Sequence, residues 1–322
     1  MHIIDSRSHP EQAYKSCLGI LSFEKKVGAE RLANACKRAL DFKIYNFQPL
    51  LIFKINGKLV VIDNNDPVGV SEDLYAKSDF YFATNKLLND SRYQKPKIIP
   101  LFPHYPINVN GLYLGTFFLK TSPSEWLKLI REAVRIWKRP RYVNHFYKER
   151  EGNFVFFSGS IWKKEKEANQ ARAEFIDFCI ERTDINFEGG FIPRTDGENQ
   201  GLDHLLNNKI YSPKKFNELI QRSILGFNNP AVLGAVSWRL AEYLNTGVPL
   251  ISLPFKIELP IYPQNGKEII MISDNTGVKD QLEQLLADLN RLKEIGKGGK
   301  EYFENHCTVE RQAQYLLSLI LN

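Results

Sequence analysis

The chain has 322 residues, enough for two domains, and its 43% hydrophobic and 25% charged residues are typical of a globular protein. Its 43 basic and 37 acidic residues give a net charge of +6. This mild excess suits a small anionic ligand or a membrane surface and argues against nucleic-acid binding. The sequence has no apolar run of the roughly 20 residues that cross a membrane and no apolar signal core, so we expect a cytoplasmic protein, at most peripheral to the inner membrane.

The four cysteines, Cys17, Cys36, Cys179 and Cys307, are widely spaced, with no C-x-x-C pair and no histidine at zinc-binding spacing. Such spacing is typical of free thiols in a reducing compartment. It predicts that the protein has no metal site.

In chain order, residues 1–45 are predicted to form two helices. Pro10 suits a first helical turn, and Gly28 ends that helix. The second helix, AERLANACKRALDF, places its apolar residues on one face at helical spacing. The pattern indicates a helical hairpin and no activity.

Residues 46–120 are predicted to form an α/β domain. The runs PLLIFKI and KLVVID are strands joined at Asn56-Gly57, a strong hairpin signal. A short helix over VSEDLYAKS follows, and then two strands over DFYFAT and PKIIPLF.

Residues 121–150 are predicted to link this domain to the next. SPSEWLKLIREAVRIWK is an amphipathic helix that Ser124 is expected to cap. The basic run RIWKRPR, from Arg135 to Arg141, either contacts anionic lipid or phosphate or forms a solvated face of the linker.

Residues 151–322 are predicted to form a second α/β domain, in which alternating strands and helices favour a parallel, doubly wound sheet. Strands are expected over NFVFFSG, INFEGGF, ILGFNN, VPLISL and EIIMIS. Helices are expected over NQARAEFIDFCIE, SPKKFNELIQRS and SWRLAEYLNTG, and two closing helices over VKDQLEQLLADLNRLKEI and TVERQAQYLLSLI.

Small residues at the ends of these strands are candidates for a binding site, because doubly wound sheets bind ligands at the carboxyl ends of their strands. Gly159 and Ser160, with Ser158 before them, follow a buried strand and can cradle a phosphate. Gly189 and Gly190 follow another strand and leave room for a ligand. Gly159 is also explained by the tight packing that many α/β units need, and Gly189 and Gly190 by a tight turn.

The helix WRLAEYLNTG supplies the next candidates. Its N-terminus, at Ser237, Trp238 and Arg239, faces the strand ends, where the helix dipole and free N–H groups favour a diphosphate. Glu242 lies on the same helix, and a carboxylate can accept two hydrogen bonds from a cis diol. The alternative for Glu242 is a solvated position on the polar face of the helix.

The N-terminal segment resembles part of a known family. HPEQAYKSCLGIL followed by GAERLANACKRAL, over about residues 8–45, is similar to the C-terminal tail of IstA-type insertion-sequence transposases. The segment lacks the catalytic acidic residues and the helix-turn-helix of those enzymes. The resemblance therefore implies an insertion element fused in frame with another gene, and no transposition.

Over about residues 48–320 the chain resembles GT-B glycosyltransferases, in particular exostosin-like and family-1-like bacterial enzymes. The resemblance rests on the order of FVFFSGSIW, NQARAEFI, FEGGF and FNNPAVLGAVSWRLAEYLNTGVPLIS, preceded by IDNNDP and SDFYF. It implies a GT-B-like α/β fold with one complete Rossmann-like C-terminal domain and a truncated N-terminal domain. It also implies transfer of a sugar from a nucleoside diphosphate donor to an acceptor hydroxyl without a metal.

The resemblance implies roles for single residues. Glu242 matches the glutamate that binds the ribose of the donor. Gly234 stands where many members carry an acidic residue that touches the sugar, so this chain departs from the family there. Arg172, Arg239 or Lys163 is expected to stabilise the departing diphosphate; the alternative for each is an exposed surface cation.

Asp63 and Asp66, in IDNNDP at the end of a strand, are the candidates for the acid–base carboxylate that the resemblance places in the N-terminal domain. A plain Asn/Asp turn is the alternative. Only about 70 residues, from Pro49 to Gly115, remain for the core of this domain. Its opening strands are therefore expected to be missing, which would expose an edge and an apolar face of the sheet.

Three functions stay open. The first is a glycosyltransferase of surface polysaccharide synthesis, with a nucleotide-sugar donor, a glycan or lipid-linked acceptor and no separate cofactor. The second is an inactive nucleotide-sugar-binding remnant of a gene that an insertion element disrupted. The third is a transposase-related DNA-binding protein, which no DNA-binding motif in the sequence supports, so no nucleic-acid partner is expected.

Overall fold

The computed structural model describes residues 50–118, 121–139, 141–272 and 277–321. The chain divides into two compact units, Met1–Pro49 and Leu50–Asn322, and all described residues belong to the second. The helical hairpin predicted over residues 1–45, with Cys17 and Cys36, lies outside the described residues. The boundaries predicted within the second unit stay predictions.

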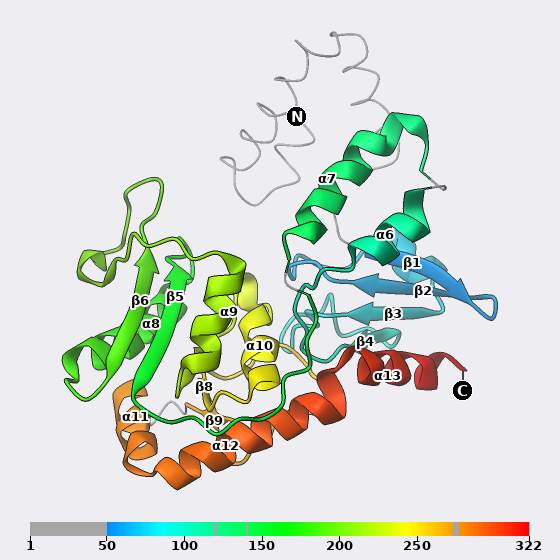
Figure 1. Cartoon of the computed structure of the whole chain (residues 1–322). Coiled ribbons are helices and arrows are strands. Elements are labelled where there is room, and N and C mark those ends of the chain that lie inside the picture. The colour runs from blue at the N-terminus through cyan, green and yellow to red at the C-terminus, as the bar shows by residue number, and fades with distance from the viewer. Residues whose placement is uncertain (1–49, 119–120, 140, 273–276, 322) are drawn as a thin grey trace. The chain divides into compact units, whose positions relative to one another are not determined.

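The second unit alternates strands and helices (Figure 1). Its strands are β1 (Leu50–Ile55), β2 (Lys58–Asp63), β3 (Phe80–Ala83), β4 (Ile98–Pro100), β5 (Phe154–Ser160), β6 (Asn186–Ile192), β7 (Gly226–Asn228), β8 (Leu250–Ser252) and β9 (Ile270–Met271). Its α-helices are α5 (Glu72–Lys77), α6 (Asn110–Phe117), α7 (Trp126–Trp137), α8 (Lys166–Glu181), α9 (Pro213–Arg222), α10 (Trp238–Thr246), α11 (Val278–Ala287), α12 (Leu289–Tyr302) and α13 (Val309–Leu321). Short 3₁₀ or π turns are η2 (Pro123–Glu125), η3 (Asp203–Leu205), η4 (Val232–Gly234) and η5 (Phe303–Cys307).

The first sheet contains β1 to β4 in that order, antiparallel between β1 and β2 and parallel from β2 onward. Asn56 and Gly57 form the turn between β1 and β2, and their positive φ angles of 49° and 80° are those that the Asn-Gly signal predicts. The predicted hairpin, the helix α5 and the two following strands are therefore confirmed.

Helices cover both faces of this sheet. Alternate residues of a strand point to opposite sides, so neighbouring residues of β2 show which helix covers each face. Val61 of β2 packs on the side of α5 with Leu74, whereas Val60 packs with Ile320 of α13. The last helix of the chain thus covers one face of the first sheet. On β1, which ends the sheet, Leu51 and Ile52 are exposed, so the apolar exposure predicted at this edge is present in the described residues.

The second set of strands is parallel, with β5 next to β6 and with β7, β8 and β9 in that order. β7 adjoins β5, since the N–H of Ile224 donates to the carbonyl of Phe154 at 2.9 Å. Phe157 of β5 packs in the core of α8 and α11, and Phe156 packs in the core of α9 and α10. Helices therefore lie on both faces of these strands, which confirms the α/β class with parallel sheets.

Three local predictions are wrong, and one helix was not predicted. Ser124 lies inside η2 and does not cap α7, which is preceded by Glu125. The first closing helix divides at Asp288, whose carboxylate accepts a hydrogen bond from the N–H of Arg291 at 3.0 Å and caps α12. The glycines of FEGG lie inside β6 and not after it. Helix α6 was not predicted, because its apolar residues have no helical period.

Two predictions about the whole chain can be compared with the described residues. Cys179 and Cys307 are buried free thiols, as predicted. Burial raises the pKa of Cys179 to about 12, which disfavours the reactive thiolate form at neutral pH. Among the described helices, none has the length and apolar character needed to cross a membrane.

Candidate functional site

Two arginine side chains meet at the carboxyl end of β5. A Cβ atom on Gly159 would lie 3.4 Å from Nη1 of Arg172 and 3.5 Å from Nη1 of Arg239. Arg172 comes from α8, and Arg239 comes from the first turn of α10. The structure therefore brings together three predicted donor-site residues that are far apart in the sequence.

Arg172 is held by neutral acceptors. Its side chain is only 1% exposed, and it donates from Nε to the carbonyl of Ala168 and from Nη1 to the carbonyl of Ser160, both at 2.9 Å. Its Nη2 donates to Oδ1 of Asn169. Burial and the nearby charge of Arg239 lower the pKa of Arg172 to about 9. The position of this guanidinium group is therefore fixed, and its contact with a donor stays a prediction.

Arg239 lies between β5 and α9. Its guanidinium group donates to the carbonyl of Ser158 and lies 5.1 Å and 5.5 Å from the ring centres of Phe157 and Phe216. Like charges in this arrangement cost free energy, which an anion bound beside them would offset. The two arginine residues and the adjacent strand end make a suitable place for a diphosphate.

The N-terminus of α10 lies at the same place. Ser237 is the N-cap of the helix, and its Oγ accepts a hydrogen bond from the N–H of Arg239 at 3.4 Å. Trp238, the first helical residue, is 58% exposed, so its ring is available to a ligand. The predicted end of this helix is confirmed: Gly247 takes a left-handed conformation with a φ of 66°.

Glu242 lies one turn after Arg239 on α10 and is partly buried. Among the described residues, no group donates a hydrogen bond to its carboxylate or forms an ion pair with it. Burial raises the pKa of Glu242 to about 7, and the charge of Arg239 offsets part of this effect. These properties do not fit a solvated glutamate. A partly buried carboxylate without a partner is costly, and it is well suited to accept hydrogen bonds from a ligand.

Asn228, at the carboxyl end of β7, was not among the predicted site residues. It is 2% exposed, and its Nδ2 donates to Oγ of Ser252 at 2.8 Å. Its Oδ1 is buried and has no partner in the described part of the chain. The available signal was a polar residue that directly follows a buried strand in ILGFNN.

Gly189 and Gly190 are required by the packing of the backbone. They have φ angles of 133° and 128°. A Cβ atom on Gly189 would lie 1.7 Å from the carbonyl oxygen of Phe157 on β5, and one on Gly190 would lie 2.6 Å from that of Leu205. This packing explains both glycines without a ligand, so their role in donor binding stays a prediction.

Asp63 holds the turn that follows β2. It is 6% exposed; one carboxylate oxygen accepts a hydrogen bond from the Tyr81 hydroxyl at 2.6 Å, and the other accepts from the N–H and Nδ2 of Asn65 at 3.0 Å and 2.6 Å. Asp66 is exposed. The Asn/Asp turn foreseen as the alternative is therefore present, and the catalytic role of either carboxylate stays a prediction.

Asn85 connects this turn to the segment before α10, and sequence reasoning missed it. Its Nδ2 donates to the carbonyl of Asn65 at 2.7 Å, and its Oδ1 accepts a hydrogen bond from the N–H of Val236 at 2.8 Å. One buried amide therefore links the loop of the acidic candidates with the start of α10, which carries the candidate donor-site residues. The signal in the sequence was again a polar residue at the end of a buried strand, in FYFATN.

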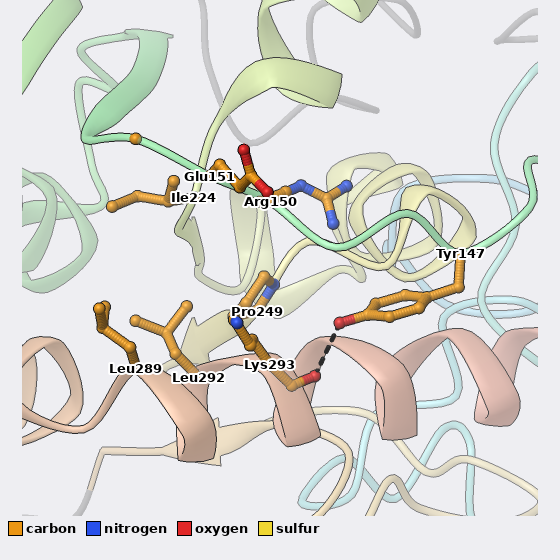
Figure 2. A pocket seen from close by; sticks show the side chains of 9 residues that line it. Tyr147, Arg150, Glu151, Ile224, Pro249, Leu289, Leu292 and Lys293 are labelled. Atoms are coloured by element: carbon orange, nitrogen blue, oxygen red, sulfur yellow. Dashed lines mark hydrogen bonds between the residues drawn. The ribbon is translucent and has the colours of Figure 1, made fainter.

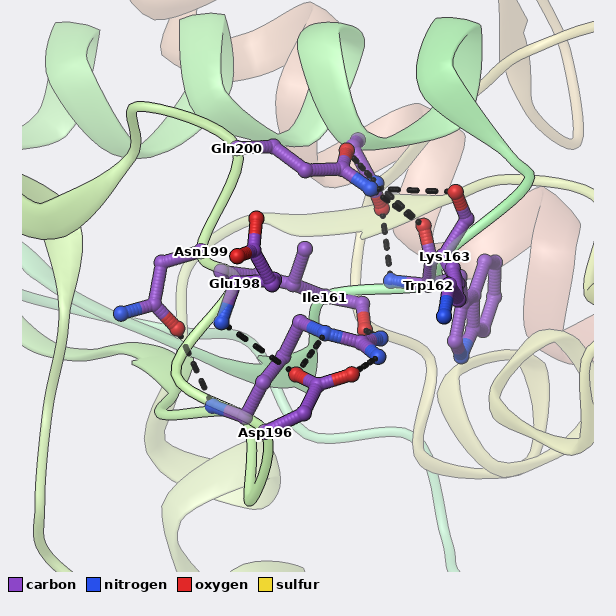
Figure 3. A network of polar contacts seen from close by, with 9 residues as sticks. Ile161, Trp162, Lys163, Asp196, Glu198, Asn199 and Gln200 are labelled. Carbon is purple, nitrogen blue, oxygen red and sulfur yellow. Dashed lines mark hydrogen bonds and ion pairs between the residues drawn. The ribbon is translucent and has the colours of Figure 1, made fainter. Parts of the chain in front are cut away.

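The loop after β6 fixes the segment after β5, as Figure 3 shows. Nη1 of Arg194 donates to the carbonyl of Ile161 at 3.0 Å. Nε2 of Gln200 donates to the carbonyls of Trp162 and Lys163 at 3.2 Å and 3.1 Å. The backbone of Lys163 is thus held beside the strand end, and its side chain is exposed, so its role toward the diphosphate stays a prediction.

A cavity of about 230 Å³ lies at the other end of the parallel strands (Figure 2). It is bordered by Gly152, Ile224 and Pro249, which precede β5, β7 and β8. Lys293 of α12 also lines it and accepts a hydrogen bond at its carbonyl from the hydroxyl of Tyr147 at 3.0 Å. Because parallel sheets bind ligands at the carboxyl ends of their strands, we do not place the donor here.

Comparison with protein families matches part of the chain. Residues 194–318 match the model of a family described as glycosyl transferase-like. The matched segment contains β7, the whole of α10 with Glu242, and β8. Residues 194–318, which lie within the part predicted to resemble a glycosyltransferase, are thus similar to a glycosyl transferase-like family.

The curated relatives that match are transposases, and they match at the N-terminal region. The chain is 47% identical over 45 residues to a putative transposase of Sinorhizobium fredii, and 49% identical over 39 residues to the putative transposase of insertion sequence IS408 from Burkholderia multivorans. These matches cover 14% and 12% of this chain. The chain spans only 9% and 8% of the length of these relatives. The predicted transposase resemblance is confirmed.

Among solved structures, the chain is similar to the C-terminal domain of a glycosyl transferase group 1 family protein from Francisella tularensis, with a TM-score of 0.37, 15% identity, and coverage of 50% of this chain and 88% of that one. It is similar to HepE of Anabaena in complex with UDP and glucose, with a TM-score of 0.44, 12% identity, and coverage of 77% and 65%. It is also similar to TarM of S. aureus in complex with UDP and two sugar compounds, with a TM-score of 0.46, 10% identity, and coverage of 80% and 48%.

Proposed function

We propose that this chain is a glycosyltransferase that binds a nucleotide-sugar donor at the carboxyl ends of β5 and β7. The glycosyl transferase-like match of residues 194–318 supports the class of reaction. The observation that carries the placement of the donor is Glu242, whose partly buried carboxylate has no partner among the described residues. The ribose of a nucleotide offers the pair of hydroxyl donors that this carboxylate lacks.

In this proposal the diphosphate lies beside Arg239 and Arg172. The sugar breaks its bond to the diphosphate oxygen and forms a bond to the acceptor oxygen, so negative charge grows on the departing diphosphate. Guanidinium groups that are already in place stabilise that charge without reorganisation. The N-terminus of α10, with Ser237 and Trp238, adds its dipole at the same point.

The proton of the acceptor hydroxyl goes to a carboxylate base. Of the two acidic candidates, we favour Asp66, because Asp63 already accepts hydrogen bonds from Tyr81 and Asn65 at both of its oxygens. Asp66 is exposed and free to approach a substrate. We further propose a glycan or lipid-linked acceptor, a role in surface polysaccharide synthesis and a reaction without a separate cofactor or metal.

An inactive nucleotide-sugar-binding protein is the second candidate, and Gly234 favours it. Gly234 has a φ of 83°, and a Cβ atom there would lie 3.1 Å from Cβ of Lys256. Glycine has no side chain, so the sugar contact that the family resemblance places at this position is absent. An acidic residue in this backbone conformation would be strained. Binding of a donor without transfer of its sugar is the outcome that this second function predicts.

The test is titration calorimetry of the full chain with nucleoside diphosphates, chosen by a thermal-shift screen. Glu242→Ala removes two hydrogen bonds to the ribose, and we expect affinity to fall roughly tenfold or more. Glu283→Ala, at an exposed glutamate on α11, is the matched control and leaves affinity unchanged. Equal affinity of the Glu242→Ala variant and the wild type would refute the placement of the donor. A transfer assay with the bound nucleotide-sugar then separates the enzyme from the inactive protein.

A further inference from the structure

Helix α7 buries only part of its apolar surface. Leu129, Ala133 and Ile136 are buried. A second set of large apolar residues on the same helix exposes between 47% and 70% of its surface: Leu127, Ile130, Val134 and Trp137. At about 100° per residue the two sets form one continuous arc over half of the helix, and half of that arc is exposed.

The exposed set continues onto the neighbouring helix α6. The ring of Phe118, at the end of α6, stacks on Trp126 of α7 with 5.5 Å between ring centres. Both rings are more than 40% exposed, and Leu112 of α6 is 73% exposed. Exposed tryptophan and phenylalanine next to aliphatic residues are typical of proteins that insert side chains at the boundary between lipid headgroups and acyl chains.

Positive charge flanks this apolar stripe on one side. Residues 110–141 contain seven basic residues and two acidic ones. Helical spacing places the cations of α7 next to the exposed apolar residues, on the side away from the buried ones. One of them, Arg135, pairs with Glu132 at 2.8 Å. The surface therefore combines an apolar stripe with a flank in which positive charge exceeds negative charge.

A basic groove begins where α7 ends. Lys138, Arg139 and Arg141 line a groove of about 550 Å³ together with Lys214 of α9. Among the described residues that line it, Glu218 is the one acidic side chain, and it lies 3.8 Å from the ammonium group of Lys215. The groove therefore has the charge and the size for a phosphate-containing headgroup.

We propose that α7 and this groove dock the protein onto an anionic phospholipid bilayer. The exposed apolar residues of α7 enter the headgroup region, and the groove binds lipid phosphate. A helix with an apolar arc and a basic flank lies in the plane of a membrane surface and does not cross the membrane. Clustered lysine and arginine residues beside it select anionic lipid. The inference does not rest on the proposed glycosyl transfer and holds for an inactive protein as well.

The test is co-sedimentation of the full chain with vesicles of phosphatidylcholine, with and without phosphatidylglycerol. We expect binding only to the anionic vesicles, and weaker binding as salt rises. Ile130→Glu places a charge in the lipid and lowers affinity roughly tenfold. Ile180→Glu, on α8, is the matched control because Ile130 and Ile180 are both 55% exposed. The Ile180→Glu variant is expected to bind the vesicles as the wild type does.

Separate variants test the role of the groove. Charge reversal of Arg139 and Arg141 together is expected to abolish the preference for anionic vesicles, whereas Lys77→Glu, at an exposed lysine of α5, preserves it. Melting temperatures of all variants confirm that they fold.

Three results would overturn the inference. One is absence of binding to anionic vesicles. Another is equal binding by the Ile130→Glu and Ile180→Glu variants. The third is a dimer, detected by light scattering, that Ile130→Glu dissociates, because the apolar face would then belong to contacts between copies of the chain.

Discussion

Glu242 lowers the stability of the fold, although the proposed function needs its carboxylate. Burial favours the protonated form of the side chain, and the pKa of Glu242 rises from 4.5 to about 7. Arg239 lies one turn away, yet the two side chains form no ion pair in the described structure. A partly buried carboxylate without a partner lowers the free energy of unfolding of the protein. A ligand that donates hydrogen bonds to this carboxylate restores part of that stability.

This balance predicts a dependence on pH. The folded protein binds a proton at Glu242 more tightly than the unfolded chain, so stability falls as pH rises from 4.5 to about 7. Glu242→Gln removes the titration. We expect the variant to exceed the wild type by about 3 kcal/mol in free energy of unfolding at about pH 8, and by nothing at about pH 4. Urea unfolding of both proteins at the two pH values measures this difference, and an advantage that does not change with pH would contradict it.

The donor-site residues differ in how far the sequence could indicate them. Arg239 was indicated by its place at the start of a helix that follows a buried strand, and Glu242 by the resemblance of this segment to GT-B glycosyltransferases. Asn85 and Asn228 were not, because a polar residue at a strand end is common, and its partners become visible only when the strands are assembled. Local sequence gives the residue type and not its distant hydrogen-bond partner.

At the scale of elements, β5 and β6 show how close packing selects glycine. Gly189 lies opposite Phe157 in the parallel pair, with its φ at 133°. The carbonyl of Phe157 occupies the space that a side chain would need. The sequence predicted a turn at this point because glycine pairs are common in turns, whereas here they permit close approach within a strand.

Gly189→Ala tests this account. We expect a loss of more than about 3 kcal/mol in free energy of unfolding, or no folded protein, because the two strands must separate. Gly197→Ala is the matched control, since Gly197 also has a positive φ, 74°, but no atom lies within 4 Å of its added Cβ. It is expected to cost about 1 kcal/mol. Equal losses in thermal or urea unfolding would contradict the packing explanation.

Most strands and helices were predictable because their signals are local. The Asn56-Gly57 turn and the end of α10 at Gly247 follow from the conformations that these residues adopt. The break at Asp288 was missed because the apolar period continues across it. The position of α13 on the first sheet was also missed, since a helical pattern predicts a helix and does not say which sheet the helix covers.

For the whole molecule, two connections matter. Asn85 joins the turn that holds Asp63 to the start of α10, and α13 carries the end of the chain back to the first sheet. Both connect parts of the sequence that were predicted as separate domains. A reaction that needs a donor on one part and a base on the other depends on these connections, and no local pattern could reveal them.

The most direct test of the central claim is a crystal structure of the full chain with the nucleoside diphosphate that binds best in the thermal-shift screen. The account predicts a ribose whose two hydroxyl groups donate to the Glu242 carboxylate, and a diphosphate beside Gly159 and Arg239. A nucleotide bound elsewhere, for example in the cavity beside Pro249 and Lys293, with Glu242 still unpartnered, would contradict it.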